Sequence, residues 1–477
     1  MEQEASFVII GGGIAGVSCA EGLQCLCPDE KTILLTASPV VKRVTNVVPL
    51  TKMLAKFDVI ETSPDSLSNV EQESLVVIQD PVASINSTNH LVTTVSGRVI
   101  RYKKLCVCTG GVPRLISKNP HVIGIRDTES VASFQKRVAN SQRIVVVGNG
   151  GIATEIVYEL TGVEIVWVIK DNHISAPFID PGAAEFFQDS LKQGKPETGD
   201  KKPIKRKVYT ISGEETVSGG AALGPDWHTN YNLHGKSSFK CKVIIEYNCE
   251  VNAVLNPAEM DDCSKTVDEP LWPVYVRLTN GKIYGCDLIV SATGVVPNSD
   301  IKFTDDKKFD LAEDKGIKVN EQMETNVIDI FAAGDVCTPV WQQATHWFQM
   351  RLWTQAHQMG SYVAKTMHAS LVNQPVLQDF CFELFTHVTN FFGFNVVLLG
   401  LFNAQKLARN YSCLLRVTSG VEYLKIVMKE GRMQGAVLIG DTDLEEMCEN
   451  LILNQLDLTN LENELLNPDI DMDDYFD

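Results

Sequence analysis

The sequence has no uninterrupted apolar run approaching the roughly 20 residues that a helix needs to cross a bilayer. It also lacks an opening series of positive charge, apolar stretch and small residues of the kind that marks a secretory leader. Its first strand-like segment begins where the apolar part of such a leader would lie. These absences predict a soluble intracellular protein with no membrane contact.

Positive charge is also scarce. Lys and Arg number 42 against 60 Asp and Glu, which gives a formal net charge of −18. Nucleic acids and anionic membranes bind clustered positive charge, so this balance argues against a broad surface for either and leaves only a local basic patch open. We therefore expect no direct contact with nucleic acid.

The number and positions of the cysteines do not indicate a set of disulphide bonds. They number 13, an odd count, and several lie in apolar runs such as Leu105–Cys108. This distribution indicates reduced thiols in a cytosolic or nuclear compartment. The chain has 477 residues, 44% of them hydrophobic, and exceeds the size at which one core stops growing, so two or three domains are expected.

What the chain does have is a glycine-rich segment at residues 7–16, FVIIGGGIAG. Four apolar residues typical of a buried parallel strand lead into Gly11, Gly13 and Gly16, and helical spacing continues from Ala15. In such a unit the three glycines make a tight turn, let the backbone approach a pyrophosphate, and let helix and strand pack closely. A glycine-rich turn in any α/β protein is the alternative, but the flanking strand and helix favour a dinucleotide site.

The strand expected at 31–38 ends in hydroxyl side chains. Its last residue is expected to meet the adenosine ribose, where Asp or Glu is usual because a carboxylate accepts both ribose hydroxyls. This chain offers Thr36 and Ser38 instead, and either hydroxyl can still hydrogen-bond. Beyond this strand, alternating stretches around 75–78 and 91–95 predict a small antiparallel ribbon inserted in a larger fold.

A second strand, glycine turn and helix occurs at 143–155, RIVVVGNGGIATE. Gly148 and Gly150 occupy the first two glycine positions, and Ala153 occupies the third, which tolerates alanine. Two such units in one chain indicate two dinucleotides.

The strand after the second turn bears on the choice between NADH and NADPH. Lys170 stands where an acid that binds the ribose 2′-hydroxyl is expected, and a lysine there tolerates a 2′-phosphate. Asp171 beside it can accept a ribose hydroxyl. The sequence therefore does not decide between NADH and NADPH.

Three further buried strands end in small residues that let the backbone approach a ligand. They close at Thr109–Gly111, at Ala292–Gly294 and at Gly334–Asp335. Taken alone, each of these three motifs is equally well explained as a turn from a strand into a loop. Asp335 is placed either to cap a helix predicted from that point or to bind a polyol.

Between about 192 and 268 the chain is polar and glycine-rich. The run KKPIKRK at 201–207 is either a solvated loop or a nuclear-import signal, because both need exposed basic residues. GPDWH at 224–228 predicts an ordered segment whose aromatic side chain belongs to a local core. Further along, a hairpin is expected through Asn280 and Gly281, and several strands, a helix and an acidic tail follow Phe380. The tail is expected to be solvated or to serve as a docking peptide.

With these motifs in this order the chain resembles the pyridine nucleotide-disulphide oxidoreductases, flavoproteins that bind two dinucleotides. In that family GGGIAG and IFAAGDV bind FAD, GNGGIATE binds NAD(P)H, and TGGVP and ATGVVPN mark the crossings between domains. The resemblance covers essentially the whole chain apart from the insertion. It implies an α/β fold of two Rossmann-like dinucleotide-binding domains, for FAD and NAD(P)H, the second inserted in the first, plus a C-terminal α+β domain.

The same resemblance implies where the domains lie. The FAD-binding domain is discontinuous, at 1–118 and 296–372, and the NAD(P)H-binding domain at 119–295 carries the insertion at about 192–268. A C-terminal domain at 376–462 and an acidic tail at 463–477 complete the chain.

Two side chains are predicted to act at the reacting rings. Glu155 is expected to face the nicotinamide and Lys52 of PLTK to pair with it, because members that resemble apoptosis-inducing factor have a lysine and a glutamate at these places, close to the isoalloxazine. Arg351 is expected to help close the flavin site. The other residues predicted to bind the cofactors, with no metal among the ligands, are Gly11, Gly13, Ile14, Ala15, Gly16, Thr36, Ser38, Lys42, Val82, Thr109, Gly110, Gly148, Gly150, Gly151, Ile152, Lys170, Gly294, Gly334, Asp335, Leu352 and Trp353.

The sequence departs from the disulphide reductases of this family. It has neither their C-x₄-C pair nor the C-terminal His-Pro pair that supplies their acid-base histidine. Cys19 and Cys25 have the wrong separation and are expected to be core thiols of the first helix, and Cys337 is expected to be buried. No cysteine falls between Lys31 and Leu105, so the single peroxide-reducing cysteine of some NADH oxidases is also missing.

The leading hypothesis is thus a FAD-dependent NAD(P)H oxidoreductase that lacks the redox-active disulphide and forms a reduced flavin–nicotinamide complex. The resemblance implies a role in the nucleus and cytoplasm, with the tRNA-splicing ligase complex as a partner that is protected from oxidative inactivation. The alternative is an NAD(P)H-dependent flavin reductase of a dedicated thiol, ferredoxin-like or quinone acceptor. A structural protein that merely retains the fold would bind no FAD.

Overall fold

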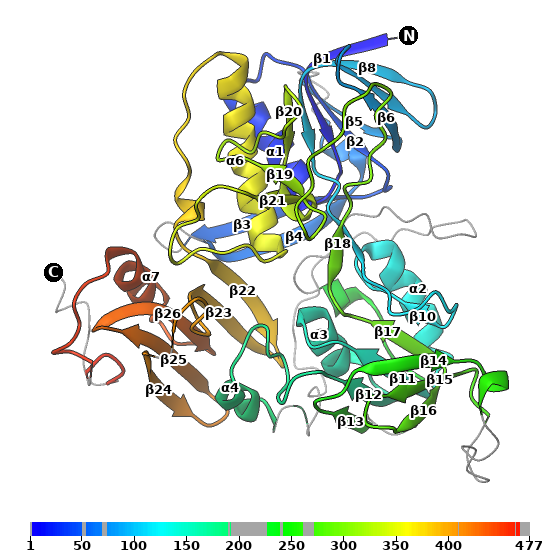
Figure 1. Ribbon diagram of the computed structural model, residues 1–477, viewed down its shortest axis with the longest axis vertical. Helices are drawn as coiled ribbons and strands as arrows, with labels where there is room; N and C mark the ends of the chain where they lie inside the picture. The colour runs from blue at the N-terminus through cyan, green and yellow to red at the C-terminus, as the bar shows by residue number, and fades with distance from the viewer. Residues whose placement is uncertain are drawn as a thin grey trace.

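The computed structural model describes residues 2–49, 54–68, 74–188, 191, 227–238, 242–260, 271–408, 410–462 and 464–467. These residues form a mixed α/β structure whose larger sheets lie in three regions (Figure 1). The N-terminal sheet lies at the top of the view, a second parallel sheet at the lower right and the C-terminal sheet at the lower left. Lys52, the basic run at 201–207 and most of the acidic tail lie outside the described residues.

The first sheet is a parallel core with an antiparallel extension. Strands β5, β2, β1 and β8 follow one another in parallel, β20 pairs in parallel with the end of β8, and β7 and β6 continue antiparallel from the start of β8. The apolar runs of β1 and β8 are buried, as expected for strands covered on both faces. The strands are β1 (Glu2–Ile10), β2 (Thr32–Thr36), β5 (Leu75–Gln79), β6 (Val82–Asn86), β7 (Leu91–Thr94), β8 (Val99–Val107) and β20 (Ile330–Ala332).

Two helices from distant parts of the chain pack closely against each other beside this sheet. They are α1 (Ile14–Leu26), which follows the first glycine turn, and α6 (Trp353–Leu371). A Cβ at Gly360 on α6 would lie 2.3 Å from the carbonyl oxygen of Ala15, so only glycine allows this approach. Contact with α6 therefore fixes the first turn of α1.

The second sheet is parallel, in the order β10-β17-β11-β12-β13. A three-stranded antiparallel sheet, β14-β15-β16, packs on it through a cluster of buried valines and isoleucines. The elements are β10 (Val122–Ile123), β11 (Arg143–Val147), β12 (Glu164–Val168), β13 (Lys242–Glu246), β14 (Val251–Leu255), β15 (Val274–Leu278), β16 (Ile283–Cys286), β17 (Leu288–Ser291), α2 (Thr128–Val138), α3 (Gly151–Glu159) and α4 (Pro181–Phe186).

Short strand pairs connect these regions. The two crossings between the dinucleotide-binding parts run side by side as the antiparallel pair β9 and β18. The elements here are β3 (Val41–Pro49) and β4 (Leu54–Thr62), β9 (Gly111–Pro113) and β18 (Val295–Pro297), β19 (Ile317–Val319) and β21 (Cys337–Pro339), with 3-10 turns η1 (Pro64–Ser66), η2 (Trp227–Asn230), η3 (Pro257–Glu259), η5 (Gly334–Val336) and η6 (Phe380–Phe382).

The C-terminal sheet is antiparallel, in the order β22-β23-β26-β25-β24. Helix α7 covers one face, while aromatic side chains of β22 and β23 on the other face join the core beside the second parallel sheet. The elements are β22 (Thr386–Phe391), β23 (Phe394–Gly400), β24 (Ser412–Thr418), β25 (Glu422–Lys429), β26 (Arg432–Ile439) and α7 (Glu445–Asn454).

The predicted fold class is confirmed, with two corrections to local structure. Leu75–Gln79 is not part of an antiparallel ribbon but pairs in parallel with β2, and β6 and β7 make the ribbon instead. The helix predicted from Asp335 is only the turn η5, because the chain enters β21 directly afterwards. In the described part of the chain, no helix has both the length and the apolar character needed to cross a membrane.

Candidate functional site

The two glycine turns share one geometry. Gly11 has φ +121° and Gly148 has φ +129°, values that other residues rarely adopt. A Cβ at Gly11 would lie 2.2 Å from the carbonyl oxygen of Cys108, and one at Gly148 would lie 2.1 Å from that of Ala292. Gly11 therefore lets the first turn contact the residues that follow β8, and Gly148 lets the second turn contact the residues that follow β17.

The second glycines face open space. A Cβ at Gly13 or at Gly150 would meet no atom within 4 Å. Each residue is the N-cap of the helix that follows, α1 or α3, and neither makes a side-chain cap. The first N–H groups of an α-helix have no partner within the helix, so both turns offer donors and a positive helix end to an anion.

One cavity of about 1430 Å³ joins the two turns. A pocket for one drug-sized ligand is usually about 300–1,000 Å³, so this space suits two nucleotide cofactors rather than one. The glycine cradles and the size of the cavity fit FAD at Gly13 and NAD(P)H at Gly150. The predicted residues that line it are Gly11, Gly13, Ile14, Ala15, Thr36, Val82, Thr109, Gly110, Gly148, Gly150, Gly151, Ile152, Glu155, Lys170, Gly294, Asp335, Arg351, Leu352 and Trp353.

Four predicted residues do not line the cavity, and two of them are glycines that serve packing. A Cβ at Gly16 would lie 1.9 Å from the carbonyl oxygen of Gly11, so this glycine allows helix and turn to touch. Gly334 has φ +80°, and a Cβ there would lie 2.8 Å from the Cβ of Ala15. Gly16 and Gly334 therefore shape the site through packing behind the cavity wall and do not line the cavity.

The other two are Ser38 and Lys42, whose side chains turn toward the start of α2. The Ser38 hydroxyl donates to Oε1 of Glu129 at 2.7 Å. This bond lowers the pKa of Glu129, but burial raises it by more, so the pKa lies above its ordinary value. Lys42 is buried, and its Nζ donates to Thr128 Oγ1 at 2.8 Å and to Glu61 Oε1 at 2.5 Å. Neither Ser38 nor Lys42 lines the cavity, which leaves Thr36 as the hydroxyl of this strand end that does.

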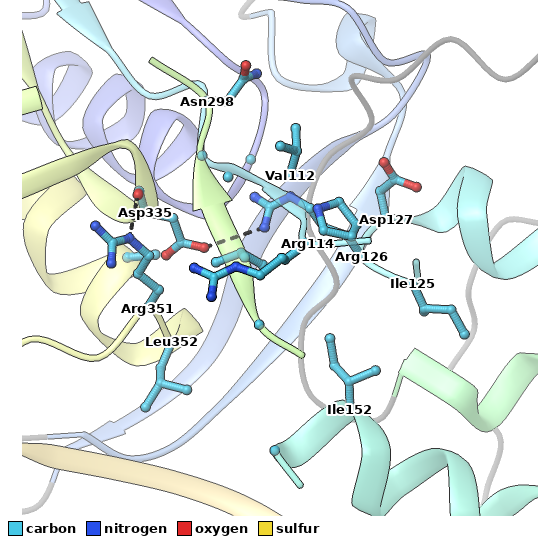
Figure 2. A pocket seen from close by; sticks show the side chains of 18 of the residues that line it. Val112, Arg114, Ile125, Arg126, Asp127, Ile152, Asn298, Asp335, Arg351 and Leu352 are labelled. Atoms are coloured by element: carbon cyan, nitrogen blue, oxygen red, sulfur yellow. Dashed lines mark hydrogen bonds and ion pairs between the residues drawn. The ribbon is translucent and has the colours of Figure 1, made fainter. Parts of the chain in front are cut away.

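Arginines hold the Gly334–Asp335 motif from two sides (Figure 2). Arg126 Nη1 lies 3.5 Å from Oδ2 of Asp335, and Arg351 Nε donates to the carbonyl oxygen of Asp335 at 2.9 Å. Arg351 is in turn held by Asp314, 2.6 Å from its Nη2. The Asp335 carboxylate therefore points into the cavity as a potential acceptor for a polyol rather than capping a helix. Arg126 was not identified from the sequence, because it lies between the recognised motifs.

Glu155 is buried in the middle of α3 and lines the cavity. Trp227 Nε1 donates to its Oε2 at 2.5 Å. The sequence predicts that Trp227 belongs to a local core, and its side chain is indeed buried, but it also lines the cavity beside Glu155. The predicted partner Lys52 lies outside the described residues.

Asn149, inside the second glycine turn, anchors the loop that follows β12. Its Nδ2 donates to Oδ2 of Asp171 at 2.8 Å and to the carbonyl oxygen of His173 at 2.9 Å, and its Oδ1 accepts from the backbone N–H of Ser175 at 2.6 Å. The Asp171 carboxylate is thus drawn toward the turn. The exposed Lys170 and the neighbouring Asp171 both line the cavity just beyond the end of β12.

The C-terminal domain adds a histidine to the cavity wall. His387 of β22 is fully buried, and burial lowers its pKa to about 3, so its imidazole is neutral. Its Nδ1 lies 3.2 Å from Thr354 Oγ1, and its ring centroid lies 5.1 Å from that of Trp353. No sequence signal pointed to His387, because it lies in a different domain from every glycine motif.

The cysteines next to the cavity are buried thiols. Cys106 and Cys108 have Sγ atoms 3.5 Å apart, and burial raises the pKa of Cys106 well above its ordinary value. Burial also raises the pKa of Cys337. Cys19 is buried in α1, whereas Cys25 is exposed. A raised pKa keeps a thiol protonated and weakly reactive.

Comparisons with known proteins place these features in context. The family model described as pyridine nucleotide-disulphide oxidoreductase matches residues 5–195 and 243–360. The chain is 49% identical to a Mus musculus protein named pyridine nucleotide-disulfide oxidoreductase domain-containing protein 1, covering 99% of this chain and 98% of the relative.

Solved structures show the same fold at low sequence identity. A covalent putidaredoxin reductase–putidaredoxin complex matches with TM-score 0.65 and 17% identity, covering 97% of each chain. A water-forming NADH oxidase from Lactobacillus brevis, bound to NADH, matches with TM-score 0.65 and 15% identity, covering 96% of this chain and 92% of that one.

Proposed function

The chain belongs to the pyridine nucleotide-disulphide oxidoreductase family and is an NAD(P)H-dependent flavoprotein oxidoreductase that uses FAD and NAD(P)H; within this class we propose that it works without a redox-active disulphide. Its working state is then the reduced flavin with the nicotinamide nucleotide still bound. The observation that carries the proposal is that both glycine turns open into one cavity, with no C-x₄-C pair anywhere in the sequence.

Bound FAD supplies a ring system that accepts a hydride from NAD(P)H. The protein holds and orients the two nucleotides. Gly13 and Gly150 leave room for a pyrophosphate at the helix starts, and Asp335 offers acceptor oxygens in the same cavity. Leu352, Trp353 and His387 of the C-terminal domain line this cavity together with Glu155.

The buried thiols support a mechanism that does not pass electrons to sulphur. Cys106 lies in β8 and Cys108 directly after the end of that strand, and burial raises the pKa of Cys106. An attacking thiol must be a thiolate, so these side chains are poor partners for a disulphide cycle. This interpretation predicts that the flavin is the sole acceptor of reducing equivalents.

An anaerobic titration with dithionite tests that prediction. A protein with only FAD takes up two electrons for each flavin, whereas a flavin with a redox-active disulphide takes up four. The variant Cys106→Ser/Cys108→Ser should take up the same two electrons and reduce at the same rate with NADH. Uptake of four electrons by the unmodified protein would refute the disulphide-free mechanism.

Rapid mixing with NADH, and separately with NADPH, followed by admission of air tests the working state. A long-wavelength charge-transfer band that decays slowly in air supports a retained complex of reduced flavin and nicotinamide nucleotide. Fast reoxidation by a thiol, ferredoxin-like or quinone acceptor would favour the alternative, a dedicated carrier reductase. A protein with no bound FAD would contradict both.

On the family resemblance alone, we also propose a role in the nucleus and cytoplasm in protecting the tRNA-splicing ligase complex from oxidative inactivation. The test is ligase activity after exposure to air, with and without this protein and NADPH. Deletion of residues 463–477, or of residues 192–226 of the insertion, then shows which segment is needed. Equal loss of ligase activity with and without the intact protein would refute this role.

A further inference from the structure

A short segment of the insertion reaches the site through Trp227. The indole is 2% exposed and belongs to η2, and its Nε1 lies 2.5 Å from Oε2 of Glu155. Both residues line the cavity, together with Ile152 one turn earlier on α3. In Figure 2 the Ile152 side chain points from α3 toward Ile125, which also lines the cavity.

A second contact holds this segment on the same face of α3. His228 Nδ1 lies 3.2 Å from Oε2 of Glu159, and its ring meets the Trp227 indole edge to face at 5.9 Å. Glu155 and Glu159 are four residues apart and so lie one above the other on the helix. Two neighbouring side chains of the insertion therefore contact two successive carboxylates of α3.

The segment stays attached beyond the end of α3. The Thr161 backbone N–H donates to Leu233 at 3.0 Å, and Gly235 donates back to Thr161 at 2.8 Å. The Thr161 hydroxyl lies 3.0 Å from Nδ1 of His234. These contacts fix residues 227–238 against α3 and the residues that follow it, and they thereby fix the position of the Trp227 indole.

We propose that Trp227 is a positioning residue for Glu155 and forms the wall beside the nicotinamide ring. This inference rests on the proposed function, because it takes the Gly150 turn as the NAD(P)H site. An indole N–H is a neutral donor, so it holds a carboxylate in one orientation and favours its ionised form without adding charge. Its ring also presents a flat apolar surface to a planar heteroaromatic ligand.

The variant Trp227→Phe keeps a ring at this place and removes the donor. Its matched control is Trp272→Phe, because Trp272 is also buried but does not line the cavity. For each holoenzyme the measurements are FAD content, the dissociation constant for NADH, and the rate of flavin reduction at saturating NADH across a pH series.

We expect Trp227→Phe to keep its FAD and to reduce about tenfold more slowly, the scale of one hydrogen bond to a charged group. The dissociation constant for NADH should change less than this rate, because phenylalanine keeps a ring beside the nucleotide while the Glu155 carboxylate loses the donor that orients it. In a Glu155→Gln background, Trp227→Phe should have little further effect, because the contact that it removes is already changed. Trp272→Phe should match the unmodified protein.

Two results would overturn the proposal. One is a Trp227→Phe profile that overlays that of Trp272→Phe. The other is a Trp227→Phe effect that multiplies fully with that of Glu155→Gln, which would show that the two side chains act independently. The proposed function itself fails in a different way, through an unmodified protein that binds no FAD or is not reduced by either nucleotide.

Discussion

Lys425 and Asp180 join the C-terminal sheet to the NAD(P)H-binding region: Nζ of Lys425 lies 2.6 Å from Oδ2 of Asp180, which caps α4. Burial would raise the pKa of Asp180, but Lys425 and a hydrogen bond from Tyr423 outweigh it, so the pKa lies below its usual range. The Lys425 side chain also donates to Asn403 at 2.9 Å. The C-terminal domain that supplies His387 is thus fixed to the region that holds Gly150.

We predict that Lys425→Met lowers the free energy of unfolding by about 2 kcal/mol, because it removes a buried cation from a partly buried carboxylate. The measurement is the midpoint of urea unfolding. Lys365→Met is the matched control, since it breaks an exposed ion pair with Asp379 and should cost less than about 1 kcal/mol. Equal losses in the two variants would contradict this account.

Valine at the second glycines should separate the two nucleotide sites. Gly13 and Gly150 have φ −78° and −87°, and a Cβ there meets no atom, so both variants should fold. Gly13→Val should lose most of its FAD, read from the flavin absorbance per protein. Gly150→Val should keep FAD and weaken NAD(P)H binding by about tenfold or more.

Gly11→Val is the contrasting variant, because its side chain would clash with the Cys108 carbonyl group. It should fail to fold, as measured by circular dichroism. A folded Gly11→Val, or FAD loss in Gly150→Val but not in Gly13→Val, would count against the assigned sites.

Acid should destabilise the protein partly through His387. Its pKa is about 3 when folded against an ordinary value of 6.5, so between these values the unfolded chain binds more protons and stability falls as pH drops. This group alone should cost roughly 1.5 kcal/mol between about pH 6.5 and pH 5. Urea midpoints of His387→Gln should therefore fall less over this interval, and parallel curves for the two proteins would contradict the prediction.

Lys170 should favour NADPH over NADH. Asn149 occupies one oxygen of the Asp171 carboxylate, and Lys170 beside it presents an exposed ammonium group to the cavity. Lys170→Ala should weaken NADPH binding by about fivefold, the scale of an exposed ion pair, and leave NADH binding nearly unchanged. The difference should shrink as salt is added. Lys318→Ala, an exposed lysine remote from the cavity, is the control.

The sequence was sufficient where function depends on local backbone. Gly11 and Gly148 have the left-handed conformation and close contacts expected of a first glycine, and Gly13 and Gly150 have the open surroundings expected of a second. These properties depend on a few adjacent residues, so a short motif predicts them. The fold class followed from the order of such motifs.

Side-chain direction and long-range contacts could not be predicted in this way. Ser38 and Lys42 bond to α2 and β4 rather than line the cavity, because partners far along the chain are available to them. Trp227 meets Glu155 across 72 residues of sequence. His387 comes from another domain. The spacing of apolar and polar residues along the sequence does not indicate such pairings, because each pairing depends on how separate elements pack.

The pairing of β20 with β8, and of α6 with α1, has a consequence for synthesis on the ribosome. All strands of the second parallel sheet lie between Val122 and Ser291, so that unit can form while translation continues. The first glycine turn is made earliest, yet its sheet still lacks Ile330–Ala332 and its helix still lacks Gly360. We therefore expect the Gly150 turn to form on the nascent chain before the Gly11 turn is fully packed, and FAD to be retained only once α6 has emerged.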